Sequence, residues 1–127
     1  MLLSPNVCVI RDERYALLKK PKEVSVITLP APNKYGAALL SSDKTIEDTM
    51  IRRIRIMLSI AADKGYKNLV LGAWGCGAFG NKPEDVSRYF KTVIVDEGYG
   101  KFFDEVCFAI YGSEDGKNIT AFRRLFE

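Results

Sequence analysis

The residues best suited to chemistry lie in a glycine-rich stretch, GAWGCGAFGN, at positions 72–81. This stretch follows an apolar run and precedes Pro83, Glu84 and Asp85, which are typical of a helix start. Glycine permits positive φ angles and lets backbone N–H groups approach a ligand without a Cβ atom in the way. Successive N–H groups in such a turn form a nest for anions, reinforced by the helix N-terminus. The pattern therefore predicts a cradle for a phosphate or diphosphate.

The alternative is that this stretch is only a tight turn from a strand to a helix and binds no ligand. Such a turn would need only one glycine, whereas the stretch contains four. The candidate ligand-binding residues of this stretch are Gly72, Trp74, Gly75, Cys76, Gly77, Ala78, Phe79, Gly80 and Asn81. The ring of Phe79 or of Trp74, or both, could stack on a ribose or a base. We favour the ligand-facing role for Phe79, whereas for Trp74 packing into the core is as good an interpretation. We interpret Cys76 as a small spacer, since a cysteine without a histidine partner is a poor nucleophile.

Residues 75–80 also match the dinucleotide pattern G-x-G-x-x-G. Its context argues against a Rossmann site, because the match follows the third expected strand and no acidic residue stands at the end of the next one, FAIYG. The chain contains no histidine, which excludes Ser-His-Asp catalysis and histidine metal sites. Acid–base chemistry would need carboxylates, and none is assigned as catalytic. We expect no metal and no cofactor.

Composition predicts one domain over residues 1–127 with an ordinary globular core. The net charge of +3 permits an anionic ligand, but the basic residues form no stripe and nucleic acid is not an expected partner. No run is long enough to cross a membrane, and the N-terminus does not read as a signal peptide, so we expect a cytoplasmic protein. Three cysteines without a CxxC pair fit that compartment, and Cys8 and Cys107 are expected to be small buried hydrophobes.

The pattern of apolar residues predicts strands at 7–10, 24–29, 67–74 and 102–111, with a loop or short helical piece over 11–22. Helices are expected over 43–64, from Pro83 to near Gly98, and in a last segment capped by Asn118. The first helix has an apolar stripe, a cap among residues 42–45 and an end at Gly65. Apolar strands that alternate with helices predict an α/β fold with a mainly parallel sheet covered on both faces.

The stretch GAWGCGAFGN followed by Pro83, with SPNVCVIRD at 4–12 and VSVITLPAPN at 24–33, resembles the microbial-type poly(ADP-ribose) glycohydrolases, a family of macrodomain proteins. The resemblance covers residues 4–126. It implies a macrodomain-like three-layer α/β/α fold and ADP-ribose, or a related nucleotide diphosphate, as ligand. It further implies that the amides of residues 75–78 wrap the diphosphate and that Phe79 positions the terminal ribose. Residues 30–33 would lie near the same site, with Pro32 and Asn33 as candidate ligand-binding residues.

The family's catalytic segment, a Gly-Gly-Gly loop followed by Gln-Glu-Glu, does not occur in this sequence. The chain therefore resembles the C-terminal part of such an enzyme, with the sheet truncated on its N-terminal side. Cleavage of the bond between riboses needs a carboxylic acid that protonates the leaving oxygen. A truncated sheet exposes an edge, and exposed edges pair, so we expect self-association or a partner chain over that edge.

The sequence is compatible with four functions. The favoured one is an ADP-ribose-binding protein related to the glycohydrolases but without their catalytic glutamates. The others are an active glycohydrolase whose acid comes from another segment or chain, a nicotinamide dinucleotide enzyme, and a structural fragment that binds nothing.

Overall fold

The computed structural model describes residues 1–127, which form two compact units, Met1–Pro30 and Ala31–Glu127. The first unit contains strands β1 (Leu2–Arg11) and β2 (Leu17–Thr28), and the second contains all other elements. No helix is long and apolar enough to cross a membrane. The expectation of one domain over the whole chain stays a prediction.

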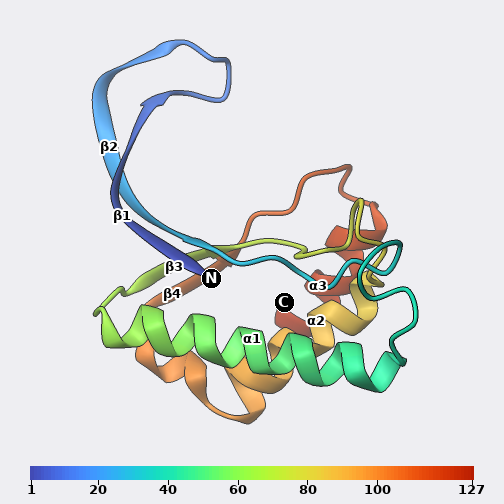
Figure 1. Ribbon diagram of the computed structural model, residues 1–127. Coiled ribbons are helices and arrows are strands. Elements are labelled where there is room, and N and C mark those ends of the chain that lie inside the picture. The colour runs from blue at the N-terminus through green and yellow to red at the C-terminus, as the bar shows by residue number, and fades with distance from the viewer. The chain divides into compact units, whose positions relative to one another are not determined.

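Strands β1 and β2 pair antiparallel as a long ribbon (Figure 1). The turn between them is built on Asp12, whose carboxylate accepts hydrogen bonds from the amides of Arg14 and Ala16, both at 2.9 Å. Tyr15 completes the turn with a φ of 62°. Asp is a frequent turn residue because its side chain binds its own backbone. The expected loop over 11–22 is therefore confirmed only for residues 12–16, and the rest of that range is wrong, since β2 already begins at Leu17.

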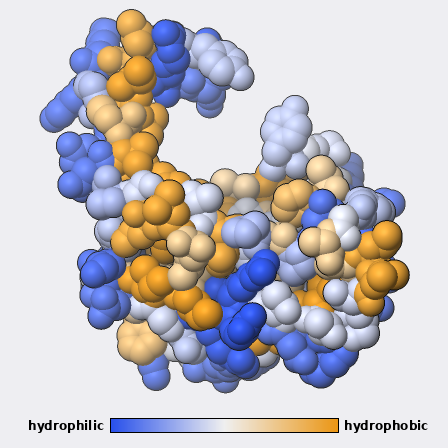
Figure 2. Space-filling view, in the orientation of Figure 1, coloured by the Kyte–Doolittle hydropathy of each residue, from blue (hydrophilic) through white to orange (hydrophobic).

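The ribbon exposes apolar side chains on its surface (Figure 2). Val24 and Val26 in β2 are 43% and 40% exposed, although the segment 24–29 was expected to be a buried strand. Cys8 in β1 is also exposed, so its expected burial is wrong. Two strands alone have no second layer to cover either face, and such a hairpin is only marginally stable in water.

Helix α1 (Asp43–Asp63) agrees with the prediction in its ends and in its buried face. Ser42 caps it, and the Ser42 hydroxyl accepts the amide of Thr45 at 3.1 Å. Gly65, at a φ of 73°, follows the last turn. The buried residues repeat at the spacing of one helix face: Ile46, Met50, Ile54, Leu58 and Ala61.

Strands β3 (Asn68–Leu71) and β4 (Glu105–Phe108) pair in parallel, from Asn68 with Glu105 to Leu71 with Phe108. Both are shorter than predicted, because the chain turns into the glycine loop at 72 and residues 99–102 form the 3-10 helix η2. With one parallel and one antiparallel pair, the fold is mixed α/β. A mainly parallel sheet is not confirmed.

Helix α2 (Pro83–Lys91) continues as a π-helical turn, η1 (Thr92–Asp96), and the segment ends at Gly98 as predicted. Its buried residues include Val86, Phe90, Val93 and Ile94, which recur at the spacing of one helix face. Helix α3 (Lys117–Phe126) follows Gly116 as its N-cap residue. The expected cap at Asn118 is wrong, because Asn118 lies inside the first turn.

An aromatic cluster joins β4 to helices α2 and α3. The ring of Phe108 lies 5.2 Å from that of Phe90, 4.9 Å from that of Phe122 and 4.7 Å from that of Phe126, between centroids. On the opposite face of the same sheet, Val70 is 76% exposed and Cys107 is exposed. The expected burial of Cys107 is therefore wrong. The prediction that helices cover both faces is also wrong for this sheet, because the face of Val70 and Cys107 is exposed.

Leu58→Ala should lower the free energy of unfolding by about 2–5 kcal/mol, because Leu58 is fully buried in the α1 stripe and its truncation leaves a cavity. The measurement is chemical denaturation with both variants at equal concentration. Ile56→Ala is the control on the same helix; Ile56 is 43% exposed and its loss should cost about 1 kcal/mol or less. Equal losses in the two variants would contradict the packing described.

Candidate functional site

The glycine-rich loop joins β3 to α2 by a series of tight turns. The amide of Trp74 donates to the carbonyl of Gly72 at 2.8 Å, and that of Cys76 donates to Ala73 at 3.1 Å. A third turn runs from the Gly80 amide to the Gly77 carbonyl at 3.0 Å. Some backbone amides of the loop therefore donate hydrogen bonds within the loop. Only the amides without such a bond are available to a ligand.

A second segment, residues 31–35, lies against this loop. The side-chain amide of Asn81, which is 4% exposed, donates to the carbonyl of Pro32 at 2.8 Å and to that of Gly75 at 3.1 Å. The amide of Lys34 donates to the Phe79 carbonyl at 2.9 Å. The structure thus brings together the two sequence segments that were expected to meet. Asn81 holds the loop in place through both of its N–H groups.

Asn33 organises its own segment. Its side-chain oxygen accepts the amide of Tyr35 at 3.0 Å, and its carbonyl accepts the amides of Gly36 and Ala38 at 3.1 and 3.0 Å. These bonds fix the turn that follows Pro32. They give Asn33 a role in shaping the segment beside the loop, whatever else it contacts.

Two of the loop glycines are required by the fold itself. Gly75 and Gly80 have φ angles of 77° and 68°, a region that side chains rarely adopt. A Cβ atom on Gly75 would lie 2.6 Å from the Cβ of Ala31, and one on Gly80 would lie 2.5 Å from the ring of Tyr35. These contacts explain two glycines without a ligand.

Gly77 is different, because nothing in the protein requires a glycine there. Its φ is not positive, and an added Cβ atom would meet no atom within 4 Å. Gly72 is also only in ordinary contact, 3.4 Å from the carbonyl oxygen of Ala109. The glycine at 77 therefore leaves open space next to the backbone at the exposed tip of the loop.

The amides of Gly75, Gly77, Ala78 and Phe79 have no hydrogen-bond acceptor in the structure. Three of these residues, 77 to 79, are exposed. The Cys76 amide, which the resemblance assigned to the diphosphate, is instead used by the turn to Ala73. Four free donors within five residues match what an anion needs from a backbone nest.

The aromatic side chains around the loop differ in exposure. Phe79 is 36% exposed, whereas Trp74 is half-buried. Sequence reasoning missed Tyr35, which is 75% exposed and whose ring lies beside Gly80. Its position two residues after Asn33 was the available signal, since residues 30–33 were already expected near the loop.

The Cys76 thiol is half-buried and lies near enough to Glu84 to feel the charge of its carboxylate. Burial, and secondarily the negative charge of Glu84, raise the pKa of Cys76 to about 11. The thiol therefore stays protonated at neutral pH, which suits a spacer and does not suit a nucleophile.

Carboxylates near the loop belong to the start of α2. Glu84 and Asp85 lie in its first turn, where negative charge stabilises a helix, and Asp85 also pairs with Arg88 at 2.9 Å. The free amides of the loop are therefore better placed to donate hydrogen bonds to an anion than the start of α2, where Glu84 and Asp85 already supply negative charge. No group of His, Cys, Asp and Glu side chains is arranged to hold a metal ion.

The chain is a mixed α/β fold in which a glycine-rich loop joins the end of a parallel strand to a helix, the place where open α/β sheets bind ligands. Comparison with solved structures identifies which proteins share this fold. The chain is similar to poly(ADP-ribose) glycohydrolase from Thermomonospora curvata, at 37% identity and a TM-score of 0.90, over 98% of this chain and 46% of that one. It is similar to the enzyme from Deinococcus radiodurans in complex with ADP-ribose, at 38% identity and a TM-score of 0.84, over 96% and 50%. The apo form of the Deinococcus radiodurans enzyme is 38% identical to this chain, with a TM-score of 0.84. No family model and no curated sequence matches.

The resemblance to microbial poly(ADP-ribose) glycohydrolases is thus confirmed over almost the whole chain. The chain spans about half the length of these enzymes, at 46% and 50% of their residues. The fold class is the macrodomain-like α/β fold of that half. Activity and substrate are properties of the whole enzymes, which are about twice as long as this chain.

Gly75→Ala should destabilise the protein by about 1–3 kcal/mol, because the new methyl group is strained at positive φ and collides with Ala31. Gly77→Ala is the matched control and should leave the melting temperature within about 2 °C of the wild type, since its Cβ meets open space. Thermal unfolding followed by circular dichroism distinguishes the two. A Gly77→Ala variant as unstable as Gly75→Ala would contradict this assignment.

Iodoacetamide at pH 8 should modify Cys8 and Cys107, which are exposed, well before Cys76. The rate at Cys76 should rise about tenfold per pH unit up to about pH 11, because only the thiolate reacts. Timed alkylation with peptide mass spectrometry gives all three rates, and protein unfolded in urea is the control. Fast labelling of Cys76 at pH 8 in the folded protein would show that its thiol is not protected.

Proposed function

We propose that this chain binds ADP-ribose, or a related nucleotide diphosphate, through the glycine-rich loop. The observation that carries the proposal is the set of free amides at Gly75, Gly77, Ala78 and Phe79 around a glycine that the fold does not need. A diphosphate accepts several N–H bonds at once, and a missing side chain at 77 lets it approach the backbone.

The ligand class is supported by the Deinococcus radiodurans relative, which was solved with ADP-ribose and is 38% identical to this chain. In the proposed complex, the exposed ring of Phe79 packs on the ribose next to the diphosphate, and Trp74 packs at the other side of the loop. Pro32, Asn33 and Asn81 hold the loop and the neighbouring turn in the binding geometry. No cofactor and no metal are needed for this binding.

We propose further that the chain corresponds to the C-terminal part of a glycohydrolase and acts as a cytoplasmic binding protein without the catalytic glutamates. The sequence contains no Gly-Gly-Gly loop followed by Gln-Glu-Glu. An active glycohydrolase, with its acid supplied by another segment or chain, is the second candidate. Hydrolysis of poly(ADP-ribose) by the purified chain, lost on replacement of one of its own carboxylates, would favour that candidate.

Phe79→Ala should weaken ADP-ribose binding by about tenfold, the loss expected for one aromatic contact with the ligand. Gly77→Ala should weaken it at least as much while the melting temperature stays unchanged, because its methyl group occupies the space of the diphosphate and not of the protein. Isothermal titration calorimetry with ADP-ribose measures both effects.

NAD and AMP titrated in parallel serve as ligand controls and should bind more weakly than ADP-ribose. Ala62→Ser on α1 is a variant control remote in sequence from the loop and should bind as the wild type does. Absence of heat and of any thermal shift with all three ligands would overturn the proposal and leave a structural fragment. Tighter binding of NAD than of ADP-ribose would favour a dinucleotide enzyme instead.

A further inference from the structure

The residue between the glycine-rich loop and α2 is a lysine, and it occupies the N-cap position of that helix. The φ and ψ angles of Lys82, −73° and 129°, are those of an ordinary N-cap. Ser42 has similar angles before α1, −67° and 154°, and its hydroxyl accepts the amide of Thr45 at 3.1 Å. The side chain of Lys82 makes no such bond, because an ammonium group has donors and no acceptor. It therefore does not cap the helix that follows.

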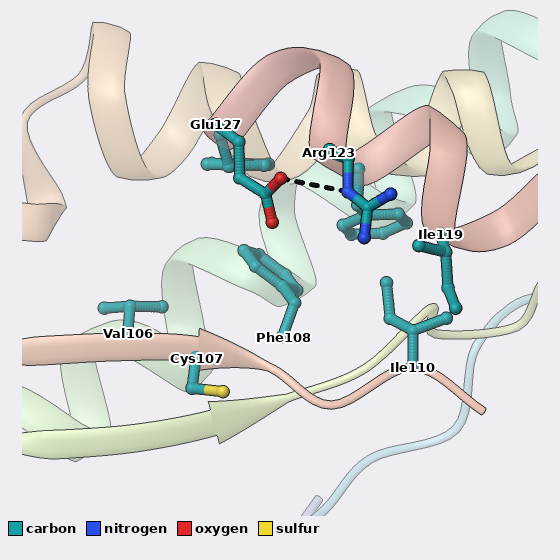
Figure 3. Close-up of a pocket in the computed structure, with 9 residues that line it drawn as sticks. Val106, Cys107, Phe108, Ile110, Ile119, Arg123 and Glu127 are labelled. Carbon is teal, nitrogen blue, oxygen red and sulfur yellow. Dashed lines mark ion pairs between the residues drawn. The ribbon is translucent and has the colours of Figure 1, made fainter. Parts of the chain in front are cut away.

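The charge of Lys82 also opposes the helix. The N-terminus of a helix carries a partial positive charge, so a cation there is unfavourable, whereas one in the last turn is favourable. Arg88 lies in the last turn of α2 and pairs with Asp85, and Arg123 lies in the last turn of α3 and pairs with Glu127 (Figure 3). Lys82 thus departs from both the capping rule and the charge rule, and such departures are expected at functional sites.

The backbone at residue 82 does not require a lysine. Pro83 restricts the residue before it to an extended conformation, whatever its side chain. The carbonyl of Lys82 accepts the amides of Asp85 and Val86, at 3.1 and 3.0 Å, which the carbonyl of any residue would do. A serine would keep these bonds and add a cap. The ammonium group is therefore what distinguishes lysine from a better residue at this position.

Lys82 adjoins the free amides of the loop. It directly follows Asn81, whose backbone amide donates to the Gly75 carbonyl at 3.1 Å. The amide of Gly75 is one of the four that have no acceptor. Lys82 is exposed, and a lysine carries its charge on a flexible four-carbon stem. Its ammonium can therefore turn toward an anion that the loop holds.

No acid neutralises this charge. Lys82 forms no ion pair. The acid three residues further on, Asp85, pairs with Arg88 at 2.9 Å. The other lysine beside the loop, Lys34, pairs with Asp43 at 3.3 Å. Of the two lysines that adjoin the loop, Lys82 is therefore the one whose charge is available to a ligand.

We propose that Lys82 is a specificity-determining residue of the glycine-rich loop, and that its ammonium pairs with a phosphate of the ligand that the free amides hold. The amides are neutral, whereas a diphosphate carries two negative charges, and a nest of amides does not remove them. Lys82 compensates one of these charges, so the site favours phosphate-bearing ligands over neutral nucleosides. The inference rests on the proposed function, since it takes the loop as the anion site, and it adds a residue on which that proposal does not depend.

Lys82→Ser should change stability and binding in opposite directions. Because serine can cap α2, the melting temperature should rise by about 2–4 °C. The affinity for ADP-ribose in about 20 mM salt should fall about three- to fivefold, the size expected for one exposed ion pair. In about 0.5 M salt the difference should shrink to less than about twofold, because salt screens exposed charges. Calorimetric titration and thermal unfolding measure the two effects.

Two further variants serve as controls. Lys82→Arg keeps the charge and should bind ADP-ribose within about twofold of the wild type. Lys101→Ser removes an exposed lysine that forms no ion pair. Lys101 precedes β4, whereas the loop follows β3, and these are opposite ends of two strands that pair in parallel. This variant loses the same net charge and should leave binding unchanged.

Inorganic diphosphate, titrated in parallel, separates this inference from the proposed function. Equal affinities of the wild type and Lys82→Ser for both probes would overturn the inference and leave the proposed function standing. An equal loss in Lys101→Ser, or a lower melting temperature in Lys82→Ser, would also contradict it. Diphosphate binding that weakens in Lys82→Ser, without any ADP-ribose binding, would support the inference and sink the proposed ligand. No binding of either probe to the wild type would overturn both.

Discussion

The candidate site depends on one buried carboxamide. The two N–H groups of Asn81 reach carbonyls in two different segments, Pro32 and Gly75, and so tie the loop to the turn that follows residue 31. Without this link the loop would keep its local turns, but only the bond from the Lys34 amide to the Phe79 carbonyl would hold it against the neighbouring segment. Because an asparagine buried to 4% exposure must find partners for its polar atoms, the same bonds that stabilise Asn81 also define the loop.

The free amides of the loop are a consequence of that arrangement. Turn bonds use the amides of Trp74, Cys76 and Gly80, and the remaining donors gather at the exposed tip between residues 75 and 79. A polar group left without a partner inside a protein is costly, whereas at an exposed tip water satisfies it until a ligand replaces the water. The loop can therefore hold a ready donor set at little cost to stability.

Sequence reasoning was most accurate where local chemistry decides the structure. The stripe of α1, its Ser42 cap and Gly65 end, and the start of α2 at Pro83 follow from helix periodicity and capping, which need no tertiary information. It failed where burial depends on a neighbour: apolar strands such as 24–29 indicate a covered sheet, but neither Val24 nor Val26 has a covering layer in its unit. In the site, the loop and segment 30–33 could be predicted. The position of the Tyr35 ring and the hydrogen bond from the Cys76 amide to the Ala73 carbonyl could not be predicted. Both depend on the geometry of the turns, which the sequence pattern does not determine.

The bond from Asn81 to Pro32 spans 49 residues of chain. The backbone hydrogen bonds of helix α1 and of the turn at Asn33 are local and can form early. Closing a segment of 49 residues costs chain entropy before any bond compensates for it. The loop should thus acquire its final shape late on the folding pathway, after α1 has shortened the distance between its two parts. A ligand held by late-forming contacts would act mainly on the rate of unfolding, and so prolong the lifetime of the folded state without accelerating its formation.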